Sequence, residues 1–135
     1  MMKVGLIGCG NIADIYIQNS QKYFNNFKIL ACADIKEEAS KIFAKKYNIH
    51  QLSVDDILAH KEIEFIINLT IPNVHFDVSK SILESKKHSY SEKPLSIEFD
   101  DGKKLNDLAK ENNVYVGCAP DTFLGAGIQT ARKLL

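Results

Sequence analysis

Short runs of β-branched and apolar residues alternate with amphipathic segments along almost the whole chain. The six expected strands are residues 3–7, 28–33, 50–52, 64–69, 88–91 and 114–118, of which 50–52 is the weakest. The segments between them carry apolar residues at the spacing of a helix face. Strands that alternate with helices form a parallel sheet covered on both faces. We therefore expect an α/β fold, a doubly wound parallel sheet of six strands with helices on both faces.

Length and charge limit the functions that such a fold could serve. The chain has 135 residues, 45% of them hydrophobic and 25% charged, which is the composition of one globular domain. Its 17 basic and 17 acidic side chains cancel, so no net charge draws it to nucleic acid or anionic lipid. Charged residues interrupt every apolar run before it reaches the length of a membrane span. We expect one domain over residues 1–135, with neither a nucleic-acid nor a membrane partner.

The cysteines and histidines predict no metal site. Cys9, Cys32 and Cys118 are odd in number and lack CxxC spacing, which indicates buried free thiols in a reducing, cytoplasmic compartment. The histidines show no metal-ligand spacing with one another. Glycines break the apolar run at the N-terminus, which argues against a signal peptide.

A glycine-rich turn follows the first expected strand and opens the first expected helix. Gly8 permits a tight turn, and Gly10 would let a pyrophosphate approach the backbone. Asn11 and Ile12 would present their backbone at the helix N-terminus, where an anion is favoured, and the small Ala13 would allow close packing of helix on strand. A glycine pattern alone is a weak signal, because such a turn can simply connect a strand to a helix.

A carboxylate at the end of the second strand strengthens the signal. Asp34 lies where an acidic residue can accept hydrogen bonds from both hydroxyls of an adenosine ribose. It would also repel a 2′-phosphate, which favours NAD over NADP, although the nearby Lys36 leaves NADP use open. The alternative is that Asp34 only caps the following segment.

Three segments together resemble the glucose-fructose oxidoreductase, inositol dehydrogenase and rhizopine-catabolism (Gfo/Idh/MocA) family of nicotinamide-dependent dehydrogenases. They are residues 8–13, residues 68–75 (NLTIPNVH) and residues 92–94 (EKP), the last being the most specific. The resemblance spans the whole chain and implies an NAD-binding Rossmann domain. It also implies a C-terminal substrate domain with an Asp/His-containing catalytic helix, to which nothing in this chain corresponds. Residues 118–123 depart from the family's pattern, and residues 129–135 have helical character without a stop signal, so we expect the chain to be cut off there.

Lys93 is the expected catalytic residue. By resemblance it lies beside the nicotinamide and hydrogen-bonds the substrate hydroxyl that becomes a carbonyl, and the Lys93–Pro94 bond is often cis in this family. It follows the fifth strand, at the sheet edge where a doubly wound fold builds its crevice. Without Glu92 and Pro94 beside it, Lys93 would be read as a solvated surface lysine. Glu92 could contact the cofactor or cap backbone amides.

The loop after the fourth strand supplies the other expected cofactor contacts. Thr70, Pro72 and Asn73 lie at the same sheet edge as Gly8 and could line the nicotinamide ribose or the diphosphate. Asn73 is also a good N-cap for the following helix. His75 is expected to neighbour the cofactor site without acting as an acid or base.

Asp121 and Thr122, after the last expected strand, could border the substrate or simply form a turn.

The function expected from these residues is that of the cofactor-binding domain of an oxidoreductase. In the complete enzyme a hydride would pass between NAD and a secondary alcohol of a sugar, cyclitol or related small molecule. The alternatives are a stand-alone NAD-binding sensor or regulatory module, and a structural scaffold without a cofactor. A homo-oligomer is compatible with the full-length enzyme, while the substrate and the reaction direction stay open.

Overall fold

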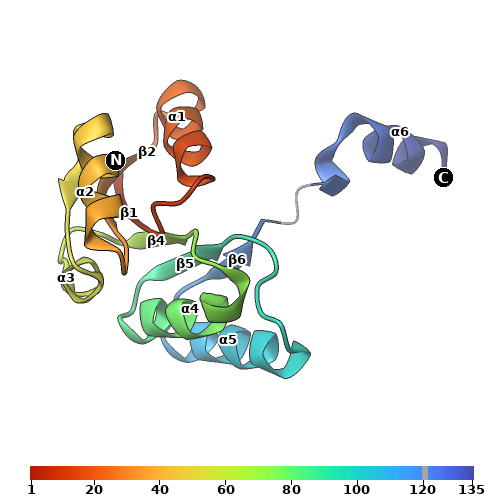
Figure 1. Cartoon of the computed structure of the whole chain (residues 1–135). Helices are drawn as coiled ribbons and strands as arrows, with labels where there is room; N and C mark the ends of the chain where they lie inside the picture. Colours follow the sequence, from red (N-terminus) through yellow and green to blue (C-terminus); the bar gives the residue numbers. More distant parts are fainter. Residues whose placement is uncertain (120–121) are drawn as a thin grey trace.

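Six parallel strands form one sheet in the order β3-β2-β1-β4-β5-β6 in the computed structural model, which describes residues 1–119 and 122–135 (Figure 1). The strands are β1 (Met2–Ile7), β2 (Phe27–Ala33), β3 (His50–Gln51), β4 (Phe65–Asn68), β5 (His88–Ser91) and β6 (Val116–Cys118). Every pair of neighbouring strands is parallel. The predicted doubly wound sheet is therefore confirmed, with strand boundaries within two residues of those expected.

Helices cover both faces of this sheet. They are α1 (Ala13–Tyr23), α2 (Glu37–Tyr47), α3 (Val54–Ala59), α4 (His75–Glu84), α5 (Phe99–Glu111) and α6 (Ala126–Leu134), with short 3-10 turns η1 (Pro72–Val74) and η2 (Thr122–Leu124). Figure 1 shows α1 and α2 on one side of the sheet and α4 and α5 on the other. α6 contributes no buried residue and lies apart from these layers.

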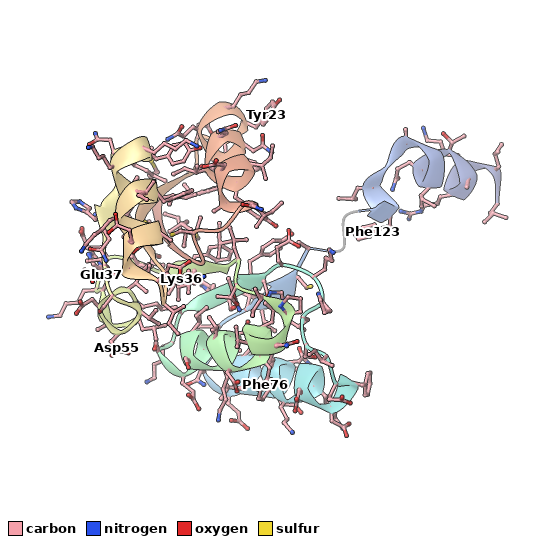
Figure 2. The ribbon with its side chains drawn as sticks, in the orientation of Figure 1. Tyr23, Lys36, Glu37, Asp55, Phe76 and Phe123 are labelled. Carbon is pink, nitrogen blue, oxygen red and sulfur yellow. The ribbon has the colours of Figure 1, made fainter. Side chains whose placement is uncertain are left out.

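The core follows from the alternation of side chains along the strands. On β1, Val4 and Leu6 face a cluster that includes Ile17 of α1 and Phe43 of α2. Ile7 faces the opposite cluster, with residues of α3 and α4. A third cluster joins α4 to α5, and Figure 2 shows Phe76 of α4 on that side. Because both faces of the sheet are covered, the central strands β1, β2 and β4 read as nearly continuous apolar runs.

One glycine of β1 lets α3 approach the sheet. A Cβ on Gly5 would lie 2.9 Å from Cδ1 of Ile57, whose side chain is fully buried. The absence of a side chain at position 5 therefore sets how closely α3 packs.

The strand order reverses between β1 and β4. From β1 the chain winds outward to β2 and β3, and from β4 it winds the other way to β5 and β6. Ile7 pairs with both Ala33 and Asn68, so the ends of β1, β2 and β4 lie level at the carboxyl edge. Such a switch point is where doubly wound sheets bind their ligands.

Two sequence expectations are corrected here. Only Cys32 is fully buried, while Cys9 and Cys118 are half-buried, because both lie in loops or edge positions with fewer covering side chains. All three cysteines are free. Asn73 belongs to η1, and the N-cap position of α4 is Val74, because the chain makes a 3-10 turn before the helix begins.

No helix among the described residues is both long enough and apolar enough to span a bilayer. No group of three or more His, Cys, Asp or Glu side chains within residues 1–119 and 122–135 could hold a metal ion.

Candidate functional site

The turn after β1 is built on a glycine that no other residue could replace without strain. Gly8 has φ of 100°, a conformation that side chains other than glycine rarely adopt. A Cβ there would lie 2.6 Å from the backbone C and O atoms of Leu69. Its N–H donates to the Ala33 carbonyl at 2.9 Å. Gly8 thus fits between the ends of β2 and β4.

The second glycine faces open space. A Cβ on Gly10 would meet no heavy atom within 4 Å. Asn11 and Ile12 are exposed, and Ile12 occupies the N-cap position of α1 without any side-chain cap. The backbone N–H groups at a helix N-terminus attract anions. Gly10 and the first turn of α1 therefore leave room for an anionic group against the backbone.

Asp34 lies directly beside the glycine turn. Its Oδ2 accepts from the Cys9 N–H at 2.8 Å, and its Oδ1 accepts from the Lys36 N–H at 2.8 Å. Each carboxylate oxygen retains a second lone pair. The two amides thus orient a half-buried carboxylate that can still accept from hydroxyl groups. Lys36, labelled in Figure 2, is exposed at the start of α2.

Cys9 is a poor nucleophile despite its place in this turn. Its thiol donates to the Ala33 carbonyl at 3.6 Å. Contact with the Cys32 thiol, followed by burial, raises the pKa of Cys9. A thiol of raised pKa stays protonated at neutral pH, and the thiolate is the reactive form. Cys9 therefore contributes its backbone N–H to the site.

The end of β4 holds a buried amide that sequence reasoning missed. Asn68 is fully buried, and its Nδ2 donates to the His75 carbonyl and to Ser79 Oγ. Its Oδ1 accepts from both the N–H and the hydroxyl of Thr70, at 3.2 and 2.6 Å. An asparagine that closes an apolar strand was the available signal, because buried polar groups need partners. Asn68 fixes the loop that carries Thr70.

The predicted residues of the loop after β4 differ in how far their side chains are exposed. Pro72 and Asn73 are exposed, and Thr70 is half-buried with its hydroxyl turned to Asn68. His75 is 1% exposed. Its ring lies between two backbone carbonyls, with Nδ1 2.6 Å from the Pro94 oxygen and Nε2 2.8 Å from the Thr70 oxygen. Both ring nitrogens are thus committed inside the protein.

The loop after β5 is held by a carboxylate. Glu92 accepts from the Lys93 N–H at 2.9 Å through Oε2 and from the Tyr16 hydroxyl at 2.8 Å through Oε1. The Glu92 N–H donates to the Asn68 carbonyl at 2.9 Å. Tyr16, on α1, was also missed, and its helical spacing marked it only as a core-facing residue. Glu92 thereby joins α1, β4 and the Lys93 loop.

Lys93 itself is exposed, and the Lys93–Pro94 bond is cis, as the family resemblance implied. Within the described residues no hydrogen bond or ion pair engages its side-chain ammonium group. Asp121 lies outside the described residues, and the backbone of Thr122 begins η2. The loops after β1, β2, β4 and β5 therefore bring the other predicted residues to one sheet edge.

Comparison with known proteins agrees with this geometry. Residues 2–119 match the Gfo/Idh/MocA oxidoreductase family, described as having an NAD-binding Rossmann fold. An uncharacterized oxidoreductase, YrbE of Bacillus subtilis, is 32% identical over 112 residues, covering 82% of this chain and 33% of the relative. Myo-inositol 2-dehydrogenase of Thermotoga maritima is 24% identical over 85% of this chain and 35% of the relative.

Solved structures show the same fold. The WlbA dehydrogenase from Bordetella pertussis, in complex with NADH and UDP-GlcNAcA, superposes with a TM-score of 0.91 at 22% identity. The match covers 98% of this chain and 38% of that chain.

A switch point, a glycine turn and an oriented carboxylate define a dinucleotide-binding Rossmann domain. The chain belongs to the Gfo/Idh/MocA oxidoreductase family and is its NAD-binding Rossmann domain. It spans about a third of the length of the curated relatives it matches.

Proposed function

We propose that this chain is the cofactor domain of a dehydrogenase that moves a hydride between NAD and a secondary alcohol of a sugar, cyclitol or related small molecule. The observation that carries the proposal is that the loops after β1, β2 and β5 meet at one sheet edge. Cys9, in the glycine turn, donates its N–H to Asp34, and Glu92, beside Lys93, accepts from Tyr16 of the adjoining helix.

Each part of this edge has a task in binding the dinucleotide. The first turn of α1 and the open space at Gly10 receive the pyrophosphate. Asp34 accepts from the adenosine ribose hydroxyls and disfavours a 2′-phosphate. Thr70, Pro72 and Asn73 border the nicotinamide side, with Asn68 fixing their loop. NAD supplies the hydride chemistry when bound.

Lys93 lies beside the nicotinamide in this proposal and acts on the substrate. Its exposed amino group is available to hydrogen-bond the substrate hydroxyl. In its neutral form it would accept the hydroxyl proton as the alcohol becomes a carbonyl, and in its protonated form it would return a proton in the reverse direction. Glu92 holds the Lys93 backbone from one side.

The substrate class is supported by relatives named for cyclitol oxidation, including the Thermotoga maritima myo-inositol 2-dehydrogenase. In this proposal the substrate pocket belongs to a second domain, as the greater length of the relatives suggests. Zero net charge and three free cysteines favour a small-molecule substrate and a cytoplasmic location, with homo-oligomers compatible with the longer enzyme.

Calorimetric titration with NAD and NADP tests the cofactor assignment. The wild-type chain is expected to bind NAD more tightly. Asp34→Asn keeps an acceptor for one backbone amide but removes the charge, so we expect the preference for NAD to fall by about tenfold or more, or about 1.4 kcal/mol. Glu38→Gln, an exposed carboxylate on α2, is the matched control and should leave the preference unchanged. Tighter NADP binding by the wild type would contradict the role of Asp34.

Turnover tests the role of Lys93. This chain alone is expected to lack dehydrogenase activity, because positioning of the substrate carbon supplies about 7 to 11 kcal/mol of the barrier. A chain extended through a second domain should gain activity, and Lys93→Ala in that chain should lower kcat by about 10² or more with NAD affinity retained. An unchanged kcat would remove Lys93 from the mechanism.

A further inference from the structure

A buried histidine joins two loops of the candidate site. The Nδ1 of His75 lies 2.6 Å from the Pro94 carbonyl oxygen, one peptide unit beyond Lys93, and its Nε2 lies 2.8 Å from the Thr70 carbonyl oxygen. Carbonyl oxygens only accept hydrogen bonds. The ring therefore contacts both carbonyls, and a nitrogen that carries hydrogen donates to the carbonyl it faces.

Buried hydrogen bonds join the groups around the ring. Asn68 and Ser79 are fully buried, and the Asn68 amide donates to both Ser79 Oγ and the His75 carbonyl. The same amide accepts twice from Thr70. Thr70 and His75 are thus tied to one another through Asn68 as well as directly, so the imidazole cannot shift without breaking several buried hydrogen bonds.

A simple filling role would not need a polar ring here. Leucine or phenylalanine would fill the space, but the Thr70 and Pro94 carbonyls would then lose their partner. On the other side of Lys93, Glu92 accepts from the Lys93 N–H and from Tyr16. The backbone is therefore held both before and after Lys93, by Glu92 and by His75.

We propose that His75 is a positioning residue that couples the loop after β4 to Lys93. A dinucleotide that contacts residues 70–73 would fix the Thr70 carbonyl, and the imidazole would carry that constraint to the Pro94 carbonyl and hence to Lys93. The inference rests on the proposed function, because it takes residues 70–73 to contact the dinucleotide and Lys93 to face the substrate. His75 itself touches neither ligand in this arrangement.

The test uses ADP-ribose, which lacks the nicotinamide ring and so leaves the space beside Lys93 uncovered. Lys93 reactivity is measured as its rate of acetylation by an N-hydroxysuccinimide ester, read by mass spectrometry with and without saturating ADP-ribose. In the wild type we expect ADP-ribose to change this rate by about fivefold or more, the lower end of ordinary coupling between sites.

Two variants each remove one arm of the bridge. The His75→Asn amide can replace Nδ1 toward Pro94, and the His75→Gln amide can replace Nε2 toward Thr70. Both should still bind ADP-ribose, while its effect on Lys93 falls below about twofold, since coupling needs both arms. His88→Gln, at the opposite end of β5, is the matched control and should keep the full effect. A packing role alone would leave the effect of ADP-ribose on Lys93 intact.

The outcomes separate the two proposals. If neither NAD nor ADP-ribose binds the wild type, the proposed function fails and this inference with it. If both bind but Lys93 does not respond, or if the His75 variants respond as the wild type does, the coupling alone is refuted.

If the variants do not fold, a measurement on the wild type tests the coupling through His75. Nitrogen NMR of the His75 ring should show that saturating ADP-ribose shifts the resonances of both ring nitrogens. Resonances that do not move on binding would overturn the proposal.

Discussion

The loop after β1 and the loop after β5 reach the same sheet edge but are held there by different forces. The glycine loop (residues 8–13) is shaped by its own backbone, through the φ of 100° at Gly8 and its hydrogen bond to Ala33. The lysine loop (residues 92–95) is held by side chains from elsewhere, since Tyr16 is 76 residues from Glu92 and His75 is 19 residues from Pro94. A loop of the first kind is visible in local sequence, and a loop of the second kind is not.

The largest effect is expected from Gly8→Ala, which changes the backbone of the glycine loop. The new Cβ would overlap the Leu69 backbone and force a left-handed conformation on alanine. We expect the free energy of unfolding to fall by about 3 kcal/mol or more, measured by urea denaturation. Gly10→Ala, whose Cβ meets open space, is the control and should leave it nearly unchanged. Equal stability of the two variants would show that the glycine loop is not shaped by Gly8.

The next effect concerns binding rather than folding. Gly10→Val places a side chain where the pyrophosphate approaches, so we expect NAD affinity to fall at least about a hundredfold, or about 2.8 kcal/mol. The far-UV circular dichroism should stay nearly unchanged, because no heavy atom lies within 4 Å of that position. Calorimetry measures the affinity. Retained binding would make the glycine loop a mere connector.

A smaller effect is expected in the lysine loop. Tyr16→Phe removes the hydroxyl that donates to Glu92 while keeping the ring that packs on the core. We expect a loss of about 1.5 kcal/mol in the free energy of unfolding, the lower end of the range for a hydrogen bond to a charged group. Faster hydrogen exchange at the Lys93 amide, with unchanged far-UV circular dichroism, should accompany it. Unchanged exchange would mean that Glu92 holds the lysine loop without help from α1.

The smallest effect is expected at Lys87, at the opposite edge of the sheet. This residue belongs to neither loop, so it shows what a change outside both loops does. Lys87 is 7% exposed and donates to the carbonyls of His60 and Ile63 at 2.7 and 2.6 Å. Burial lowers the pKa of Lys87 below the ordinary 10.5. The unfolded chain therefore holds this proton more tightly, so this group makes the free energy of unfolding rise with pH between the lowered pKa and 10.5.

Urea denaturation of the wild type and Lys87→Met across this range isolates the contribution, because the other lysines titrate in both proteins. The wild type should gain slightly on the variant as pH rises, and NAD affinity should be the same in both at neutral pH. A wild type that loses stability relative to Lys87→Met as pH rises would contradict the assignment.

Sequence reasoning located β1, β2 and β4 well because these central strands are buried on both faces and so read as short apolar runs. It placed Asp34 beside the glycine turn because a fixed spacing in a strand-turn-helix unit brings the two together. It did not find Asn68 or Tyr16, and it took Asn73 for a helix cap where a 3-10 turn intervenes. These depend on contacts between segments that no local pattern records.

By itself, then, the sequence determined the α/β class, the glycine turn and the family, since these depend on residue spacing and on the conformational freedom of glycine. The tertiary structure alone decided that His75 is enclosed between two carbonyls and that Glu92 is shared by Tyr16 and the Lys93 amide. The two partners of a hydrogen bond must be close in space, but they can be far apart along the chain. Partners such as these can therefore be recognised only once the sheet has brought its loops to one edge.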